Sequence, residues 1–342
     1  MSHMHVGIVG HGTWLPSTHL TAAEIARTTG IPEDVIAYKF GVRQKPVSGP
    51  GETTATMGLW AAQRALSDGG VTGSEIDLVI WCGAQHKDYP CWLAGLYVAN
   101  QIGARGAWSF DMEAMCGSMM VALDVAKSLL LARDDLQTVL LVSGYRNNDL
   151  IDLKEPATRF MLDIGSGASA LVLKKNAGRN AVLASSFRGD GSFSEMCVVP
   201  TLGSRVWPPS PGDEARAHFI VPDEEAFKKK LNDLTLPNFY AVIRESLARS
   251  RLSSASIDYL AILHFKRSAH EAVLKELGLG PENTTYLDDY GHLGQNDQVL
   301  SLELGLAAGK VRDGSTVVFV GAGLGFVWAA TVIRWGPFEE QT

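Results

Sequence analysis

Short, almost entirely apolar runs recur along the chain, and longer amphipathic stretches lie between them. The runs are rich in Val, Ile and Leu and cover residues 76–80, 139–142, 170–173, 257–263 and 317–320. Such runs are typical of strands that are buried on both faces of a sheet. Residues 56–66 and 239–252 instead carry apolar side chains every three or four positions, as amphipathic helices do. This alternation predicts an α/β fold in which helices cover a mixed or parallel sheet.

Two pairs of segments repeat at nearly the same distance along the chain. The sequence Ser-Glu-Ile-Asp at 74–77 leads into an apolar run, and Ala-Ser-Ile-Asp at 255–258 does the same, while the glycine-terminated strands at 138–144 and 316–321 also match. Both matches are separated by about 180 residues, and chance matches would not be expected to share an offset. The sequence therefore predicts a duplicated α/β unit with halves at residues 5–175 and 176–336.

Composition narrows the class of protein. The chain has 342 residues and a net charge of −7, which argues against a nucleic-acid binder. No basic and apolar leader opens it and no apolar run approaches the ~18 residues of a membrane span, so we expect neither signal peptide nor membrane segment. The cysteines have neither zinc-like nor disulfide-scaffold spacing, which favours a reducing, cytoplasmic location; they are Cys82, Cys91, Cys116 and Cys197.

Cys116 is the candidate nucleophile. A strand is expected to end near Phe110 and a helix to begin at about Cys116, with Gly117 leaving the thiol approachable. A thiol at a helix N-terminus lies in the positive end of the helix dipole, which favours the reactive thiolate. The alternative is an inert core cysteine, since Cys is among the most buried residue types.

Two histidines could act on such a thiol. His264 follows an apolar strand and so lies at its carboxyl end, where ligand sites collect in α/β sheets. His292 lies between glycines, and Asp297 follows near the start of a helix, where its carboxylate could orient the imidazole in a nucleophile–base–orienter triad. Alternatively, His264 is structural and Asp297 or Asn296 is an ordinary helix cap.

The segment Gly-Ala-Gly-Leu-Gly at 321–325 follows the last predicted buried strand. Such a turn can aim backbone N–H groups at an oxyanion. It does not form a dinucleotide-binding fingerprint, because residues 326–333 read as a strand instead of a helix.

Taken in order, these segments resemble β-ketoacyl synthase III, a condensing enzyme of the thiolase fold, over nearly the whole chain. Residues 7–16, 39–43, 163–168 and 323–328 resemble the family's opening strand, its T-G-I-R segment, its G-D-G-A-G-A turn and its G-G-G-F-T-W turn. Cys116 falls at the nucleophile, and His264 matches the histidine of H-Q-A-N. The resemblance implies a duplicated α/β/α/β/α sandwich, with the nucleophile in the N-terminal half and the catalytic histidines in the C-terminal half.

The chain also departs from the family's pattern. His292 stands at the asparagine of G-N-T-S, residues 265–267 replace Q-A-N, and Leu324 replaces a glycine of the oxyanion turn. The stretch from His292 to Asp297 resembles a divergent branch that primes polyketide pathways or transfers acyl groups with a Cys-His-Asp triad. Elongating ketosynthases use Cys-His-His, so His264 with His292 could still support decarboxylation.

The resemblance implies an acyltransferase that loads an acyl group from acyl-CoA or an acyl carrier protein onto Cys116. His292, oriented by Asp297, would be the base, and the N–H groups of Cys116 and Leu324 would hold the oxyanion. The acceptor could be a hydroxyl, amine or thiol in polyketide, natural-product or fatty-acid-type biosynthesis. Decarboxylative condensation with malonyl carrier protein is one alternative. A non-catalytic subunit of a heterodimeric synthase is another, which the retained Cys116 disfavours.

The same resemblance suggests the substrate contacts and partners. The substrate-binding residues are expected to be Lys39, Lys266, Arg267, Asn296 and Phe326, with the basic pair 266–267 meeting an acidic carrier protein at the mouth of a tunnel. Coenzyme A or phosphopantetheine enters as a thioester substrate, so no cofactor or metal is expected. A homodimer is expected, with residues 81–85 and 92–98 as its interface.

Overall fold

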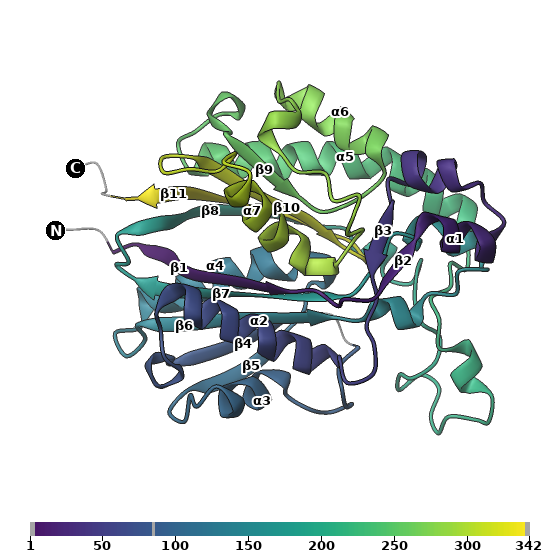
Figure 1. The fold of residues 1–342 in the computed structure, drawn as a ribbon, viewed down its shortest axis with the longest axis horizontal. Coiled ribbons are helices and arrows are strands. Elements are labelled where there is room, and N and C mark those ends of the chain that lie inside the picture. The colour runs from purple at the N-terminus through teal and green to yellow at the C-terminus, as the bar shows by residue number, and fades with distance from the viewer. Residues whose placement is uncertain (1–3, 84–85, 339–342) are drawn as a thin grey trace.

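The computed structural model describes residues 4–83 and 86–338, and within them a mixed nine-stranded sheet organises the chain (Figure 1). The strand order is β5-β4-β6-β7-β1-β8-β11-β10-β9. The strands are β1 (Val6–Trp14), β4 (Leu78–Cys82), β5 (Trp108–Met112), β6 (Thr138–Tyr145), β7 (Gly167–Lys175), β8 (Arg179–Gly189), β9 (Tyr259–Ile262), β10 (Thr316–Gly323) and β11 (Val327–Pro337). A separate ribbon pairs β2 (His19–Thr21) with β3 (Gln44–Pro46).

The α-helices alternate with these strands. They are α1 (Ala22–Thr29), α2 (Thr54–Gly69), α3 (Ala94–Gln101), α4 (Ser118–Ala132), α5 (Glu224–Arg249), α6 (Arg267–Leu277) and α7 (Asp297–Ala307). The strands and helices expected from the apolar runs are confirmed. The predicted α/β fold class is confirmed as well.

The two halves of the sheet repeat one arrangement. In the first half, β4 runs parallel to β6, β6 pairs antiparallel with β7, and β7 pairs antiparallel with β1. In the second half, β9, β10, β11 and β8 follow the same sequence of parallel and antiparallel pairings. The halves meet where Gly7 of β1 pairs with Ala181 of β8. The repeated segments found in the sequence thus occupy equivalent strands, β4 with β9 and β6 with β10.

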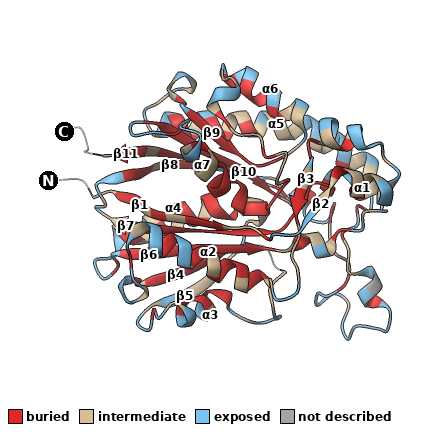
Figure 2. Ribbon diagram, viewed as in Figure 1, coloured by how far each residue is buried: buried red, intermediate tan, exposed pale blue. Residues whose placement is uncertain are grey.

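Three apolar clusters divide the helices into layers. α2 and α3 pack with one face of β4, β6 and β7, and α5 and α6 pack with one face of β9, β10 and β11. α4 and α7 lie between the halves, since their side chains cluster with strands from both. Figure 2 shows the inner strands of the sheet as predominantly buried and the central helices as buried in part. The turn before α4 and the turn before α7 contact each other. The first carries Cys116, and the connection that contains the second carries His292.

α4 explains one apparent membrane signal. Met115–Ala132 is long and apolar enough, by length and composition, to span a membrane, contrary to the sequence expectation. Met119, Met120, Leu123 and Leu130 are nevertheless fully buried between the two halves. These buried side chains pack against strands from both halves, and that packing accounts for the hydropathy of the helix.

One predicted interface segment lies in the core. β4 is an interior strand, and the indole of Trp81 is 1% exposed beneath α2, so the expectation that the segment starting at Trp81 forms a subunit interface is wrong for its first residues. Residues 84 and 85 of that segment lie outside the described residues. In the second segment Leu93 and Leu96 are exposed, at 42% and 48%.

Candidate active site

The turn that carries Cys116 connects β5 to α4. Met115 adopts a positive φ of 49°, and a single 3₁₀ turn, Met115–Gly117, precedes the helix. The buried Ser118 hydroxyl fixes this turn, because it accepts the Ala114 N–H at 2.8 Å and donates to the Met115 carbonyl at 2.6 Å. The Cys116 thiol therefore lies in front of the α4 N-terminus, where the helix dipole favours an anion. Cys116 is partly exposed.

The predicted triad is assembled. His292 Nε2 lies 3.2 Å from Cys116 Sγ, and His292 Nδ1 lies 2.6 Å from Asp297 Oδ2. A carboxylate can only accept, so Nδ1 carries a proton and the neutral ring presents an unprotonated Nε2 to the thiol. The arrangement allows His292 to take the thiol proton while Asp297 fixes the orientation and tautomer of the ring.

Asp297 is fully buried and saturated with donors. Besides His292, its carboxylate accepts the backbone N–H of Leu293 at 2.7 Å and that of His264 at 2.7 Å. Burial alone would lower the pKa of His292, but the Asp297 carboxylate and the Cys116 sulfur outweigh it and raise that pKa well above 6.5. The two partners therefore favour the protonated form of His292, which is the form that results once it has taken the thiol proton.

Glycines bring the His292 loop against the turn at 163–165. The His292 N–H donates to the Asp163 carbonyl at 2.8 Å, and the Gly165 N–H donates to the His292 carbonyl at 2.9 Å. Gly291 has a φ of +63°, and a Cβ built there would lie 2.2 Å from the Asp163 carbonyl oxygen. Only glycine fits this approach, which explains the Gly-His pair in the sequence.

His264 enters the site through its backbone rather than its ring. Its Nδ1 lies 2.8 Å from Asp163 Oδ2, and its Nε2 lies 3.0 Å from the Gly41 carbonyl. Both partners are acceptors, so the ring satisfies both contacts only when both nitrogens carry protons. The ring that the sequence placed beside the nucleophile is thus engaged elsewhere, because the 163–168 turn and the 39–43 segment close around it.

A buried lysine supports the same turn. Lys45 is 2% exposed, and its Nζ donates to the carbonyls of Leu162 and Ile164 at 2.8 and 2.7 Å. Burial lowers the pKa of Lys45 to about 8, although the neighbouring Asp163 charge raises it. Sequence reasoning missed Lys45 and the carboxylate of Asp163, because nothing local marks a lysine in β3 as buried.

Tyr145 is a further residue that the sequence analysis missed. It is the last residue of β6 and is 3% exposed, and its ring centroid lies 6.2 Å from that of His292. Burial raises the pKa of the Tyr145 phenol well above its ordinary value, and the Cys116 sulfur raises it further. The carboxyl end of a buried strand was the signal that selected His264, and the same rule would have selected Tyr145.

The glycine-rich turn lies against the nucleophile turn, as the oxyanion hypothesis requires. A Cβ built on Gly323 would lie 2.0 Å from the Ala114 carbonyl oxygen, and one built on Gly117 would lie 3.6 Å from the Gly323 nitrogen. The two turns therefore touch through their backbones. The assignment of the Cys116 and Leu324 N–H groups as oxyanion donors stays a prediction.

The predicted substrate contacts have different environments. Lys39 and Lys266 are exposed, whereas the Arg267 guanidinium pairs with Asp288 at 2.9 Å and lies 4.3 Å from the centre of the Tyr286 ring. Asn296 is 1% exposed, and its amide bonds to the Ser169 hydroxyl and the Leu293 carbonyl. Its role as a substrate-binding residue stays a prediction; in this structure both ends of the amide hold the backbone and β7.

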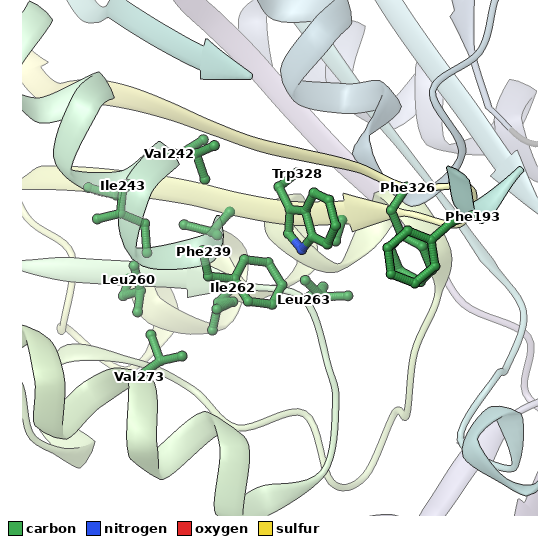
Figure 3. Close-up of a cluster of buried hydrophobic side chains, with 14 of the residues drawn as sticks. Phe193, Phe239, Val242, Ile243, Leu260, Ile262, Leu263, Val273, Phe326 and Trp328 are labelled. Carbon is green, nitrogen blue, oxygen red and sulfur yellow. The ribbon is translucent and has the colours of Figure 1, made fainter. Parts of the chain in front are cut away.

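Phe326 belongs to an aromatic cluster next to the glycine-rich turn. Its ring lies 4.7 Å from that of Phe193 and 5.4 Å from that of Trp328, between centroids. Figure 3 shows Phe326 and Phe193 at one end of the apolar cluster and Trp328 beside them. The ring is 9% exposed because it packs within this cluster, and its role in binding substrate stays a prediction. Among the described residues, no group of three or more His, Cys, Asp or Glu side chains could hold a metal ion.

Known proteins agree with this architecture. The family model of 3-oxoacyl-[acyl-carrier-protein] synthase III matches residues 110–191. A second model, of the C-terminal part of the same enzyme, matches residues 247–335. The chain belongs to the 3-oxoacyl-[acyl-carrier-protein] synthase III family. It is an enzyme of the acyltransferase class, and it has the thiolase fold of that family.

Relatives match along their whole length. A β-ketoacyl-[acyl-carrier-protein] synthase III from Paramagnetospirillum magneticum is 27% identical over 96% of this chain and 98% of its own. The crystal structure of 3-oxoacyl-(acyl carrier protein) synthase III from Pseudomonas aeruginosa PAO1 is similar with a TM-score of 0.84 and 24% identity, covering 98% of this chain and all of its own. The priming β-ketosynthase of the R1128 polyketide pathway has a TM-score of 0.85 and 22% identity, covering 98% of both chains.

Proposed function

We propose that this family member loads an acyl group from a coenzyme A or carrier-protein thioester onto Cys116 and passes it to a hydroxyl, amine or thiol acceptor. The observation that carries the proposal is the Cys116–His292–Asp297 relay, with 3.2 and 2.6 Å between successive partners. A base held this way can remove a proton twice in each catalytic cycle.

In the first half-reaction His292 Nε2 takes the Cys116 proton, and the thiolate attacks the thioester carbonyl. The bond from the acyl carbon to the donor sulfur breaks, and the departing thiol regains its proton from His292. In the second half-reaction the acceptor loses its proton to His292 and attacks the acyl-enzyme, which frees the Cys116 thiolate. The N–H groups of Cys116 and Leu324 would stabilise both oxyanions; one such donor is typically worth about 10²–10³ in rate.

The environment of His264 favours simple transfer over decarboxylation. Stabilising the enolate of malonyl carrier protein would need an uncommitted donor beside the sulfur, and both ring nitrogens of His264 already meet Asp163 and Gly41. Decarboxylative condensation is the second candidate, because the curated relatives are named β-ketoacyl-[acyl-carrier-protein] synthase III.

The partners follow from this chemistry. Acyl-CoA or a carrier-bound acyl thioester would be the donor, with no cofactor beyond the thioester itself. Lys39 and Lys266, both exposed, would attract an acidic carrier protein. We propose that the protein forms a homodimer through the edge strand β5 and the exposed side chains of Leu93 and Leu96. We propose a cytoplasmic location as well.

Intact-protein mass spectrometry after incubation with a panel of acyl-CoAs tests the proposal. A donor-specific mass gain should appear in wild type and in Cys91→Ser, and it should be lost in Cys116→Ala. Malonyl carrier protein is then added. Retention of the acyl group without carbon dioxide release supports an O-, N- or S-acceptor, whereas stoichiometric carbon dioxide release would favour condensation. No mass gain with any coenzyme A or carrier-bound donor would overturn acyl loading.

A further inference from the structure

Tyr145 is the side chain next to the nucleophile that the triad does not explain. It ends β6, a buried strand, and its backbone pairs with Gly167 of β7. A Cβ built on Gly294 would lie 2.5 Å from Cδ2 of the Tyr145 ring, so the absence of a side chain at Gly294 makes room for that ring. Gly294 has a φ of +64°, where an L-residue would also be strained.

The orientation of the phenol is set by its surroundings. The ring lies beside the His292 imidazole, with 6.2 Å between centroids and 57° between planes, and Nε2 of that imidazole lies 3.2 Å from the Cys116 sulfur. Burial raises the pKa of the Tyr145 phenol well above its ordinary value, and the Cys116 sulfur and the Asp297 carboxylate raise it further. A phenol that stays protonated donates to sulfur and cannot act as a base.

His292 Nε2 is in contact with the sulfur, and the Tyr145 phenol is a second donor group close to this pair. In the second half-reaction His292 takes the proton of the acceptor, so its Nε2 faces the acceptor at the moment when the acyl–sulfur bond breaks. The electron pair of that bond goes to Cys116, and charge develops on the sulfur. Hydrogen bonds to charged groups are stronger than those between neutral groups.

We propose that Tyr145 is a fourth catalytic residue, whose O–H stabilises the Cys116 thiolate as it leaves the acyl group. The role deepens the acyl transfer proposed above and rests on it. No proton leaves the phenol: the acceptor proton goes to His292, the acyl group to the acceptor, and the sulfur departs as a hydrogen-bonded thiolate. The resulting thiolate–imidazolium pair is the state that begins the next cycle.

Tyr145→Phe tests the role, because it removes the oxygen and keeps the ring that packs beside Gly294. Tyr259→Phe is the matched control, since it removes a buried phenol that bonds to Thr285 and Ser301 instead. The first readout is the pH dependence of iodoacetamide alkylation at Cys116, followed by peptide mass spectrometry. Cys91 is exposed, and its alkylation is measured separately on its own peptide. Burial raises the pKa of both Cys82 and Cys197 to about 12, so these two thiols should not be alkylated.

The second readout is the loss of a preformed acyl-enzyme when hydroxylamine is added as the acceptor. In Tyr145→Phe we expect the alkylation midpoint to rise by about one pH unit and the chase to slow about tenfold. In Tyr259→Phe we expect the alkylation midpoint of wild type and a chase rate within about twofold of wild type.

Several results would overturn the role. Alkylation and chase like those of wild type in Tyr145→Phe would show that the phenol does not act on the sulfur. A shifted midpoint with an unchanged chase would confine the phenol to the resting enzyme, and equal losses in both tyrosine variants would reduce the effect to packing. If wild type forms no acyl-enzyme with any donor, acyl transfer itself fails, and the leaving-group role fails with it. The alkylation midpoint would then still report separately whether the phenol holds the thiolate.

Discussion

The backbone N–H of His264 donates to Asp297 Oδ2 at 2.7 Å, while the imidazole of His264 lies on Asp163. The same carboxylate oxygen accepts Nδ1 of His292. The ring of His292 therefore contacts the Cys116 sulfur, whereas His264 reaches the same carboxylate only through its backbone N–H.

Asp297→Asn should lower acyl-enzyme formation about 10²–10⁴-fold, because an amide no longer fixes the tautomer of His292. Loss of the carboxylate also removes a cause that raises the pKa of His292, so the thiolate–imidazolium pair forms less readily. The pH midpoint of Cys116 alkylation should then rise. Asp258→Asn is the control, because the Asp258 carboxylate accepts the backbone N–H of Thr316 in β10. Equal losses in both variants would contradict the orienting role of Asp297.

His292→Ala and His264→Ala should separate the two histidines. Removing a general base typically costs about 10²–10⁴ in rate, so His292→Ala should nearly abolish acyl transfer. His264→Ala should keep acyl transfer within about tenfold of wild type and lower the melting temperature instead, because its ring holds Asp163 to Gly41. Single-turnover acylation and thermal melts measure both effects. A loss in His264→Ala as large as in His292→Ala would favour the Cys-His-His alternative.

Lys45→Met should destabilise the fold by about 2–4 kcal/mol, because two buried carbonyls lose their donor. These carbonyls flank Asp163, so the rate of acylation should fall together with the free energy of unfolding. Lys310→Met is the matched control, because Lys310 also donates to two carbonyls, at Pro281 and Thr284, but lies nearer the surface and far along the chain from the triad. Urea unfolding of both variants tests the difference, and equal free energies would contradict it.

His270 should make the fold sensitive to mild acid. Its ring is 4% exposed, neither nitrogen has a partner, and burial lowers its pKa from 6.5 to about 4, with His264 and Arg267 adding to the effect. Below pH 6.5 the unfolded chain binds a proton that the folded protein does not. The stability that this histidine contributes is complete above pH 6.5 and is lost as the pH falls toward 4, a change of about 3 kcal/mol.

His270→Phe should flatten this dependence, since the pocket is already aromatic with Phe265 and Tyr286 around the ring. The measurement is the free energy of unfolding in urea at several pH values between 4 and 7. His19→Phe, at an exposed position, should leave the slope unchanged. A His270→Phe slope identical to that of wild type would refute the argument.

The sequence by itself determined the layers and the triad. Apolar runs gave β4, β6, β7, β9 and β10, because a strand buried on both faces must be apolar throughout. Cys116 before a helix, and His292 followed by Asp297 at the start of another, are local patterns. Their chemistry depends on helix termini and glycine turns that a short stretch of sequence encodes.

Only the tertiary structure decided which side chains reach the sulfur. His264 and Tyr145 both end or follow buried strands, yet the ring of His264 bonds to Asp163 and the ring of Tyr145 lies beside His292. Asn296 and Lys45 are polar residues, yet long-range packing buries both. Side-chain direction and burial depend on segments more than a hundred residues apart, such as 41, 163 and 264, and no local pattern records which of them meet.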